Sequence, residues 1–151
     1  MKGIALAAAL TSAGLLAGPF SAQDPEEKVT LESLPPAVQR AVKAQSEGGV
    51  LRGLTKERQD GATVYEVELT VHGRRKDMIL DAQGTTLIVE EETNLSEIPP
   101  LARSAIQKAV GKGKLLLVEK VTKGEVTFYE AQVSNGKALE VKVDADGRTV
   151  E

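Results

Sequence analysis

The chain has 151 residues, a formal net charge of −3 and no cysteine. This length allows one ordinary domain or two very small ones. The slight negative charge excludes the basic surface that nucleic-acid binding needs, and without cysteine the protein has neither a disulfide framework nor a cysteine for a lipid anchor.

Residues 1–22 have the pattern of a secretory signal peptide. Lys2 precedes an uncharged run, and Pro19 and the small residues Ser21 and Ala22 follow it. The run, residues 4–17, is shorter than the roughly 20 residues that a transmembrane helix needs. We therefore expect a periplasmic or extracellular protein with no membrane span after signal cleavage. The alternative is an uncleaved membrane anchor. The polar residues 23–28 are expected to form a disordered leader.

Residues 29–92 predict one helix followed by a four-stranded antiparallel meander. A helix over 36–45 begins at a proline pair, because proline is favoured in the first turn of a helix. The clearest strand has apolar residues at every odd position from Tyr65 to Val71, the period of a strand with one buried face. The expected strands are 50–58, 63–71, 76–81 and 85–91.

Residues 93–151 repeat this order about 64 positions later. Leu34-Pro35-Pro36 returns as Ile98-Pro99-Pro100, and Asp81-Ala82-Gln83-Gly84 returns as Asp144-Ala145-Asp146-Gly147. The expected second helix is 100–110, and the strands are 115–123, 126–134, 137–144 and 148–151. The predicted fold is α+β, with two tandem repeats that each pack a helix on a four-stranded antiparallel β-meander. A unit of about 60 residues is marginal alone, so we expect one cooperative structure.

The repeated pattern resembles the tandem PepSY-like family of secreted proteins, which share the fold of the β-lactamase-inhibitor protein. The likeness is carried by Leu34–Val42, Val64–Leu69 and Leu80–Gly84, and in the second copy by Phe128–Ala131 and Val143–Gly147. It implies a helix on an antiparallel sheet, export, and a role in binding or restraining peptidases. It supplies no catalytic residues. The β-lactamase inhibitors use a disulfide in each repeat and an aromatic-rich concave face, which this chain lacks, so inhibition of a β-lactamase is not expected.

The candidates for chemistry have simpler structural explanations. His72, the only histidine, stands in an expected turn without a His or Cys partner for zinc. Asp144 and Asp146 resemble the start of a calcium loop, but no glutamate closes it, and a β-turn is predicted. Glu66 and Glu68 could form an acid–base pair, but alternating glutamates are typical of a solvated strand. We predict no catalytic residue, no metal ligand, no cofactor and no enzyme.

Two charged runs are interpreted as solvated edge or turn residues. They are Arg74-Arg75-Lys76 and Glu90-Glu91-Glu92, and such charges also discourage unwanted strand addition. Tyr65 is expected in the core beneath the first helix. Strand alternation puts Phe128 on the opposite face, where it could be an exposed anchor. The alternative, in which Phe128 competes for the core, stays open.

The predicted function is a non-catalytic exported binding module that is a monomer or weak dimer. It would engage or restrain a peptidase or another envelope protein through its sheet face. The residues expected on that face are Phe128, Glu66, Glu68, Glu130 and Gln132. The alternative function is an envelope sensor of a small ligand or metal ion, which would use the acidic faces around Glu66, Glu68 and Asp144.

Overall fold

The structure is a computed structural model, and it describes residues 26–46, 48–134 and 136–150. The expected signal peptide, residues 1–22, lies outside the described residues. In the part that is described, no helix is long and apolar enough to cross a membrane. The end of the expected leader is ordered, because Glu27–Lys28 forms strand β1 and the Glu27 carboxylate lies 3.6 Å from Lys56 Nζ.

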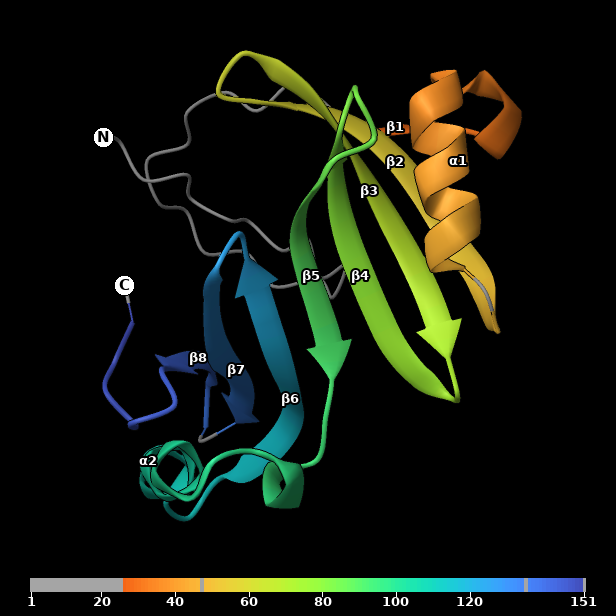
Figure 1. Cartoon of the computed structure of the whole chain (residues 1–151). Coiled ribbons are helices and arrows are strands. Elements are labelled where there is room, and N and C mark those ends of the chain that lie inside the picture. The colour runs from red at the N-terminus through yellow and green to blue at the C-terminus, as the bar shows by residue number, and fades with distance from the viewer. Residues whose placement is uncertain (1–25, 47, 135, 151) are drawn as a thin grey trace.

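Within the described residues, eight antiparallel strands form one continuous sheet, in which each strand pairs with the next one along the chain. In the described residues the strands are β1 (Glu27–Lys28), β2 (Gly49–Gln59), β3 (Ala62–Val71), β4 (Arg74–Asp81), β5 (Thr86–Glu92), β6 (Lys114–Lys123), β7 (Val126–Ser134) and β8 (Ala138–Val143). The helices are α1 (Pro36–Gln45) and α2 (Pro100–Val110), and short 3-10 helices, η1 (Leu31–Ser33) and η2 (Leu95–Glu97), precede them. Figure 1 shows α1 near one end of the sheet and α2 near the other.

The predicted fold class is confirmed, since two helix-plus-sheet halves follow one another along the chain. The halves are joined edge to edge, because β5 of the first half pairs with β6 of the second. In the second half the strand expected at 148–151 is a single bridge between Thr149 and Val143. The equivalent pair in the first half is Leu80 with Thr86, at the start of the much longer β5. We call the β5–β6 junction the seam.

Each helix covers its own hydrophobic core on the same side of the sheet. The first core contains the buried residues Leu34, Val38, Val42, Leu54, Tyr65, Val67, Leu69, Met78 and Leu80. The second contains Ile98, Ala102, Ile106, Val118, Ala131, Val133 and Val143. Tyr65 is only 7% exposed, so its predicted place in the core is confirmed. The cores follow the apolar positions of the repeat, because alternating residues of a strand face opposite sides of a sheet.

The repeated Asp-Ala-x-Gly segment is a turn that contacts the first turn of the helix. Asp81 Oδ1 accepts hydrogen bonds from the backbone N–H groups of Gln83 and Thr85, at 2.9 and 2.8 Å. A Cβ added to Gly84, which has φ +80°, would lie 2.6 Å from the carbonyl oxygen of Ala37. The second copy repeats this geometry. The turn predicted at Asp144–Gly147 is therefore confirmed, and the motif serves to dock the turn on the helix.

Candidate functional site: the helix-free face

The face of the sheet opposite α1 and α2 carries most of the candidate residues, and we call it the helix-free face. Its members follow from the strand register, because directly paired residues point to the same side. Val67 and Met78 are paired and lie in the core under α1, so their neighbours Glu66, Glu68 and Asp77 point the other way. By the same register the helix-free face includes Ile79, Ile88, Glu90, Glu119, Val121, Phe128, Glu130, Gln132 and Lys142.

All five residues predicted for a protein-binding face lie on the helix-free face, but in two separate groups. Glu66 and Glu68 are on β3, whereas Phe128, Glu130 and Gln132 are on β7, and three strands stand between them. At the usual strand spacing this is about 19 Å along the sheet. Asp144 follows β8, still further from Glu66. The acids that the sensor alternative combined therefore do not form one site.

Phe128 is on the predicted face, but the expectation that it is an exposed anchor is wrong. Its side chain is 8% exposed and forms a third core with Ile88 and Val121, against which Ile79 and Val150 pack. Sequence reasoning missed this core because its members come from β5, β6 and β7, and only the register across the seam brings them together. The exposed apolar residue of this strand is Val126, which is 60% exposed.

Beside the third core, three acidic side chains meet at the seam. They are Asp77 on β4, Glu90 on β5 and Glu119 on β6, and one carboxylate oxygen of each lies within 4.8 Å of those of the other two. Asp77 and Glu90 are direct cross-strand partners. Glu90 is 9% exposed and Glu119 is 6% exposed. The expectation that Glu90 is a solvated edge residue is therefore wrong, because β5 is an inner strand of a continuous sheet.

Burial raises the pKa values of all three carboxyl groups. The pKa of Glu90 rises to about 8, because the group is desolvated and because Glu119 and Glu130 are near it. The pKa of Glu119 rises to about 7 through desolvation, which the positive charge of Arg75 partly offsets. Burial also raises the pKa of Asp77, although Arg75 Nη2 lies 3.4 Å from its Oδ2 atom. Arg75 thus acts on Asp77 and Glu119, whereas every charged group that acts on Glu90 is negative.

The first repeat shows how a buried acid on this face is normally satisfied. Thr55 on β2 stands opposite Glu66 on β3, and its hydroxyl donates a hydrogen bond of 3.1 Å to Glu66 Oε2. In the second repeat the residue in the position of Thr55 is Glu119, which stands opposite Glu130. Glu130 is neutralised by Lys142 Nζ at 3.0 Å. Within the described part of the chain, no hydrogen bond or ion pair to the Glu119 carboxylate is found.

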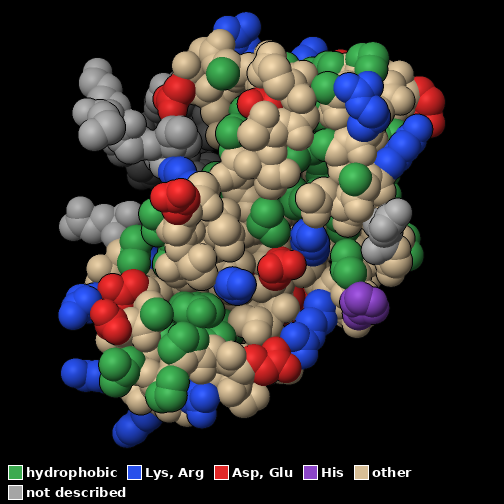
Figure 2. Space-filling model, in the orientation of Figure 1, with side chains coloured by type: hydrophobic (Ala, Val, Ile, Leu, Met, Phe, Trp, Pro, Cys, Tyr) green, Lys and Arg blue, Asp and Glu red, His purple; other side chains and the backbone are tan. Residues whose placement is uncertain are grey.

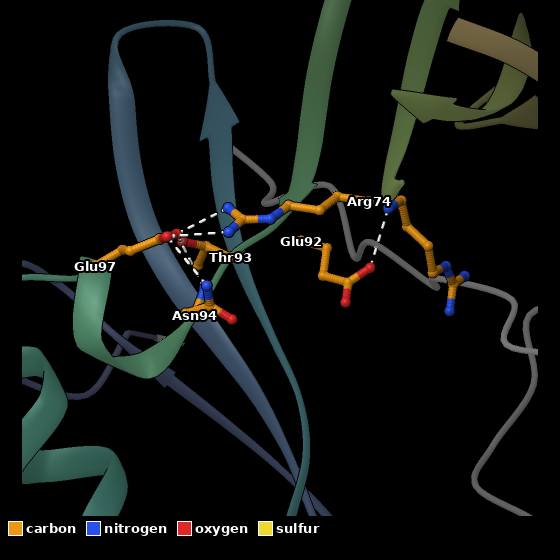
Figure 3. Close-up of polar contacts among 6 residues, drawn as sticks. Arg74, Glu92, Thr93, Asn94 and Glu97 are labelled. Carbon is orange, nitrogen blue, oxygen red and sulfur yellow. Dashed lines mark hydrogen bonds and ion pairs between the residues drawn. The ribbon is translucent and has the colours of Figure 1, made fainter. Parts of the chain in front are cut away.

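A short polar network fixes the connection between the halves (Figure 3). Arg74 at the start of β4 donates two hydrogen bonds to the Glu97 carboxylate in η2, at 2.8 and 3.0 Å. Thr93 and Asn94 donate to the same carboxylate. The bonds from Arg74, followed by those from Asn94, lower the pKa of Glu97 to about 2. The backbone N–H of Arg75 donates to Glu92 Oε2 at 3.0 Å. The connection between the halves, from Glu92 to Glu97, is therefore bonded to the start of β4 at both of its ends.

On the helix-covered side, a charged cleft of about 530 Å³ lies at the same junction. It is lined by Val71, His72, Arg74, Arg75, Lys76, Glu91, Glu92, Thr93 and Lys120. Figure 2 shows positive and negative side chains mixed in this region, between the two halves of the molecule. His72 is exposed in the β3–β4 turn with φ +51°, as predicted for a turn residue. The lining contains four basic side chains, Arg74, Arg75, Lys76 and Lys120, and two acidic ones, Glu91 and Glu92, so basic groups predominate in the cleft.

Comparison with known proteins places the fold. No family model matches the sequence, and no curated protein matches it. Among solved structures, a protein of Bacteroides eggerthii provisionally assigned to the periplasm has a TM-score of 0.65 at 18% identity, over 78% of this chain and 86% of that one. A BLIP-like protein of Bacteroides fragilis has a TM-score of 0.59 at 20% identity, over 78% and 84%. A DUF2874 family protein of Bacteroides uniformis has a TM-score of 0.62 at 15% identity, over 78% and 86%. The chain therefore shares the fold of these Bacteroides proteins, which is a PepSY-like fold.

Proposed function

We propose that the protein is a non-catalytic binding module of the cell envelope or the extracellular space. It engages another exported protein, for instance a peptidase, through the helix-free face. The observation that carries the proposal is the composition of that face, which combines acidic side chains with a buried apolar core and with Val126, an apolar residue that is 60% exposed. Export is supported by the signal-like residues 1–22 and by the provisional periplasmic assignment of a protein with the same fold.

The charge of the face indicates the chemistry of the partner. Glu68 and Glu140 are exposed on its two halves, and complementary charge guides both the rate and the register of protein association. The partner surface should therefore be basic, with an apolar part that meets Val126. Phe128, as a buried residue, supports the shape of the face, while Val126 and Gln132 are accessible for contact. We further propose that the module acts as a monomer or weak dimer.

The proposal is tested by capture of envelope proteins on the immobilised protein, followed by affinity measurement with the purified peptidase or other protein that is recovered. Val126→Lys should weaken that affinity by about tenfold or more, because a charge would replace the exposed apolar side chain that this face offers for contact. Leu101→Lys is the matched control, since Leu101 is 59% exposed on α2, away from the helix-free face. Equal effects of the two substitutions, or recovery of abundant background proteins alone, would refute the proposal.

A further inference from the structure

When its carboxyl groups are ionised, the acidic group at the seam has a negative charge that the protein itself does not compensate. Asp77, Glu90 and Glu119 bring three carboxylate oxygens within 4.8 Å of one another. Arg75 supplies one positive charge, through its contact with Asp77. Fully ionised, the group therefore keeps two negative charges, next to Glu92 on one side and to the Glu130–Lys142 pair on the other. A divalent cation would neutralise these two remaining negative charges.

The second observation is the state of Glu119 and Glu90 themselves. Their side chains are more than nine-tenths buried, and among the described residues neither carboxylate has a hydrogen bond or an ion pair. Buried carboxylates are normally hydrogen-bonded, paired or bound to a metal, because an isolated buried charge is strongly unfavourable. Both side chains point their free oxygens into the same small space as Asp77. An oxygen-lined space with unsatisfied acceptors has the features of a cation site.

The comparison of the two repeats argues against chance crowding of surface acids. The first repeat places a hydroxyl donor, Thr55, opposite its buried glutamate. The second repeat has Glu119 in that position and supplies Lys142, in the place of Ile79, to the opposite glutamate, Glu130. Glu119 is thereby left without a donor from its own half. Its carboxylate lies instead beside Asp77 and Glu90, which the first half contributes across the seam.

We propose that Asp77, Glu90 and Glu119 bind one Ca²⁺ ion on the helix-free face, at the seam between the two halves. The donors are carboxylate oxygens alone, which favour a hard cation over zinc or copper. Ca²⁺ binds oxygens at about 2.3–2.6 Å, so oxygens on opposite sides of the ion are about 4.6–5.2 Å apart. The three oxygens lie within 4.8 Å of one another, which is close enough for one Ca²⁺ ion to contact all of them. Ca²⁺ accepts an irregular coordination geometry, whereas Mg²⁺ demands near-ideal octahedral geometry and usually keeps several waters. Bound Ca²⁺ would link β4, β5 and β6, and so couple the two halves. This inference does not rest on the proposed protein partner.

The test is calorimetric titration of the chelator-treated protein with CaCl₂, with the melting temperature followed in parallel. Calcium sites in extracellular modules bind with Kd on the order of 10⁻⁴–10⁻³ M, so the titration must extend into the millimolar range. We expect one Ca²⁺ per chain and a melting temperature that rises with Ca²⁺, as linkage requires. Glu119→Gln and Asp77→Asn should each weaken binding by about tenfold or more, because each removes a charged ligand.

Two controls make the result decisive. Glu140→Gln removes a charge from the same face at the repeat position of Asp77, and Asp146→Asn alters the turn that resembles a calcium loop. Both should bind Ca²⁺ within about twofold of the parent. Without Ca²⁺, Glu119→Gln should melt at or above the temperature of the parent, because the cost of burying an unpaired carboxyl group is removed. A loss of Ca²⁺ binding in this variant is then not caused by a loss of folding. The site is overturned if the parent shows neither heat nor thermal shift, if a control loses as much affinity as Glu119→Gln, or if Mg²⁺ acts as strongly as Ca²⁺.

Discussion

The two halves of the sheet have the same order of elements, but they distribute their apolar side chains differently. The first half concentrates them under its helix, where Tyr65, Leu69, Met78 and Leu80 are all buried. The second half has smaller residues there, such as Ala102 and Ala131, and buries the large side chain of Phe128 on the opposite side, where the first half buries the smaller Val64. The third core that results lies on β5, β6 and β7, across the seam. The large aromatic side chain of Phe128 thus packs against Ile88 of the first half and not in the core under α2.

The largest effects are expected where each half buries its aromatic residue. Tyr65→Ala removes a ring from the first core, and Phe128→Ala removes one from the third. Each should lower the free energy of unfolding by about 3–5 kcal/mol, the usual cost of emptying a buried aromatic site. In a domain with a total stability of about 5–15 kcal/mol, both losses are severe.

Urea midpoints of Tyr65→Ala and Phe128→Ala, measured side by side, test whether the first and the third core contribute equally to stability. Tyr129→Ala is the comparison within the second repeat, because Tyr129 occupies the repeat position of Tyr65 but is only partly buried. It should cost less than either of the other two substitutions. A loss of about 0.5 kcal/mol for Phe128→Ala, the size typical of an exposed position, would show that the third core contributes little.

Much of this architecture could be predicted from the sequence, and the part that could not has a definite cause. Alternation predicted which face each residue of β3 occupies and favoured the face opposite Tyr129 for Phe128, because the period of a strand is a local property. It could not predict that β5 would pair with β6, because the register between strands from different repeats depends on nonlocal contacts. The third core, the burial of Glu90 and the acidic group at the seam all depend on that pairing. The three consecutive glutamates at 90–92 were the only local signal, and a solvated edge strand has the same composition.

Intermediate effects are expected at the two glycines that touch the helices. Gly84 and Gly147 have φ +80° and +78°, and an added Cβ on either would lie 2.6 Å from a helix carbonyl oxygen. Alanine at these positions combines backbone strain with a backbone clash, so each substitution should cost about 2 kcal/mol or more. Gly61→Ala is the matched control, with φ +83° and open space around the position. It should cost about 1 kcal/mol, for strain alone.

Calorimetry of these glycine variants also tests whether the halves unfold together. The Arg74–Glu97 network and the continuous sheet join the two repeats, so either substitution should shift one common transition. A variant in which half of the unfolding enthalpy stays at the parent melting temperature would show that the repeats unfold independently.

The smallest effect concerns Glu66, the acid that the first repeat satisfies with Thr55. Burial raises the pKa of Glu66 to about 7, and the hydrogen bond from Thr55 only partly opposes it. The charged groups that act on it are Glu68 on its own strand, Glu57 on β2 and Glu26 ahead of β1, and all are negative; across β4 it meets the apolar Ile79. Because the folded pKa lies above the unfolded value of 4.5, the folded state holds the proton more tightly. This contribution to stability is complete below about pH 4.5 and is lost as the pH rises to about 7.

Glu66→Gln should therefore remove a penalty that is present only at higher pH. The amide keeps an oxygen that can accept the Thr55 hydrogen bond, but it carries no charge. After a discount for the partial exposure of this side chain, we expect the variant to exceed the parent by about 1 kcal/mol in free energy of unfolding at pH 8. At pH 4 the two proteins should be equal. Urea unfolding at both values, in the presence of a chelator, measures the difference. Glu125→Gln in the exposed β6–β7 turn is the control for the loss of one surface charge. A Glu66→Gln variant that is less stable than the parent at pH 8 would mean that the carboxylate is ionised and well satisfied in the folded protein.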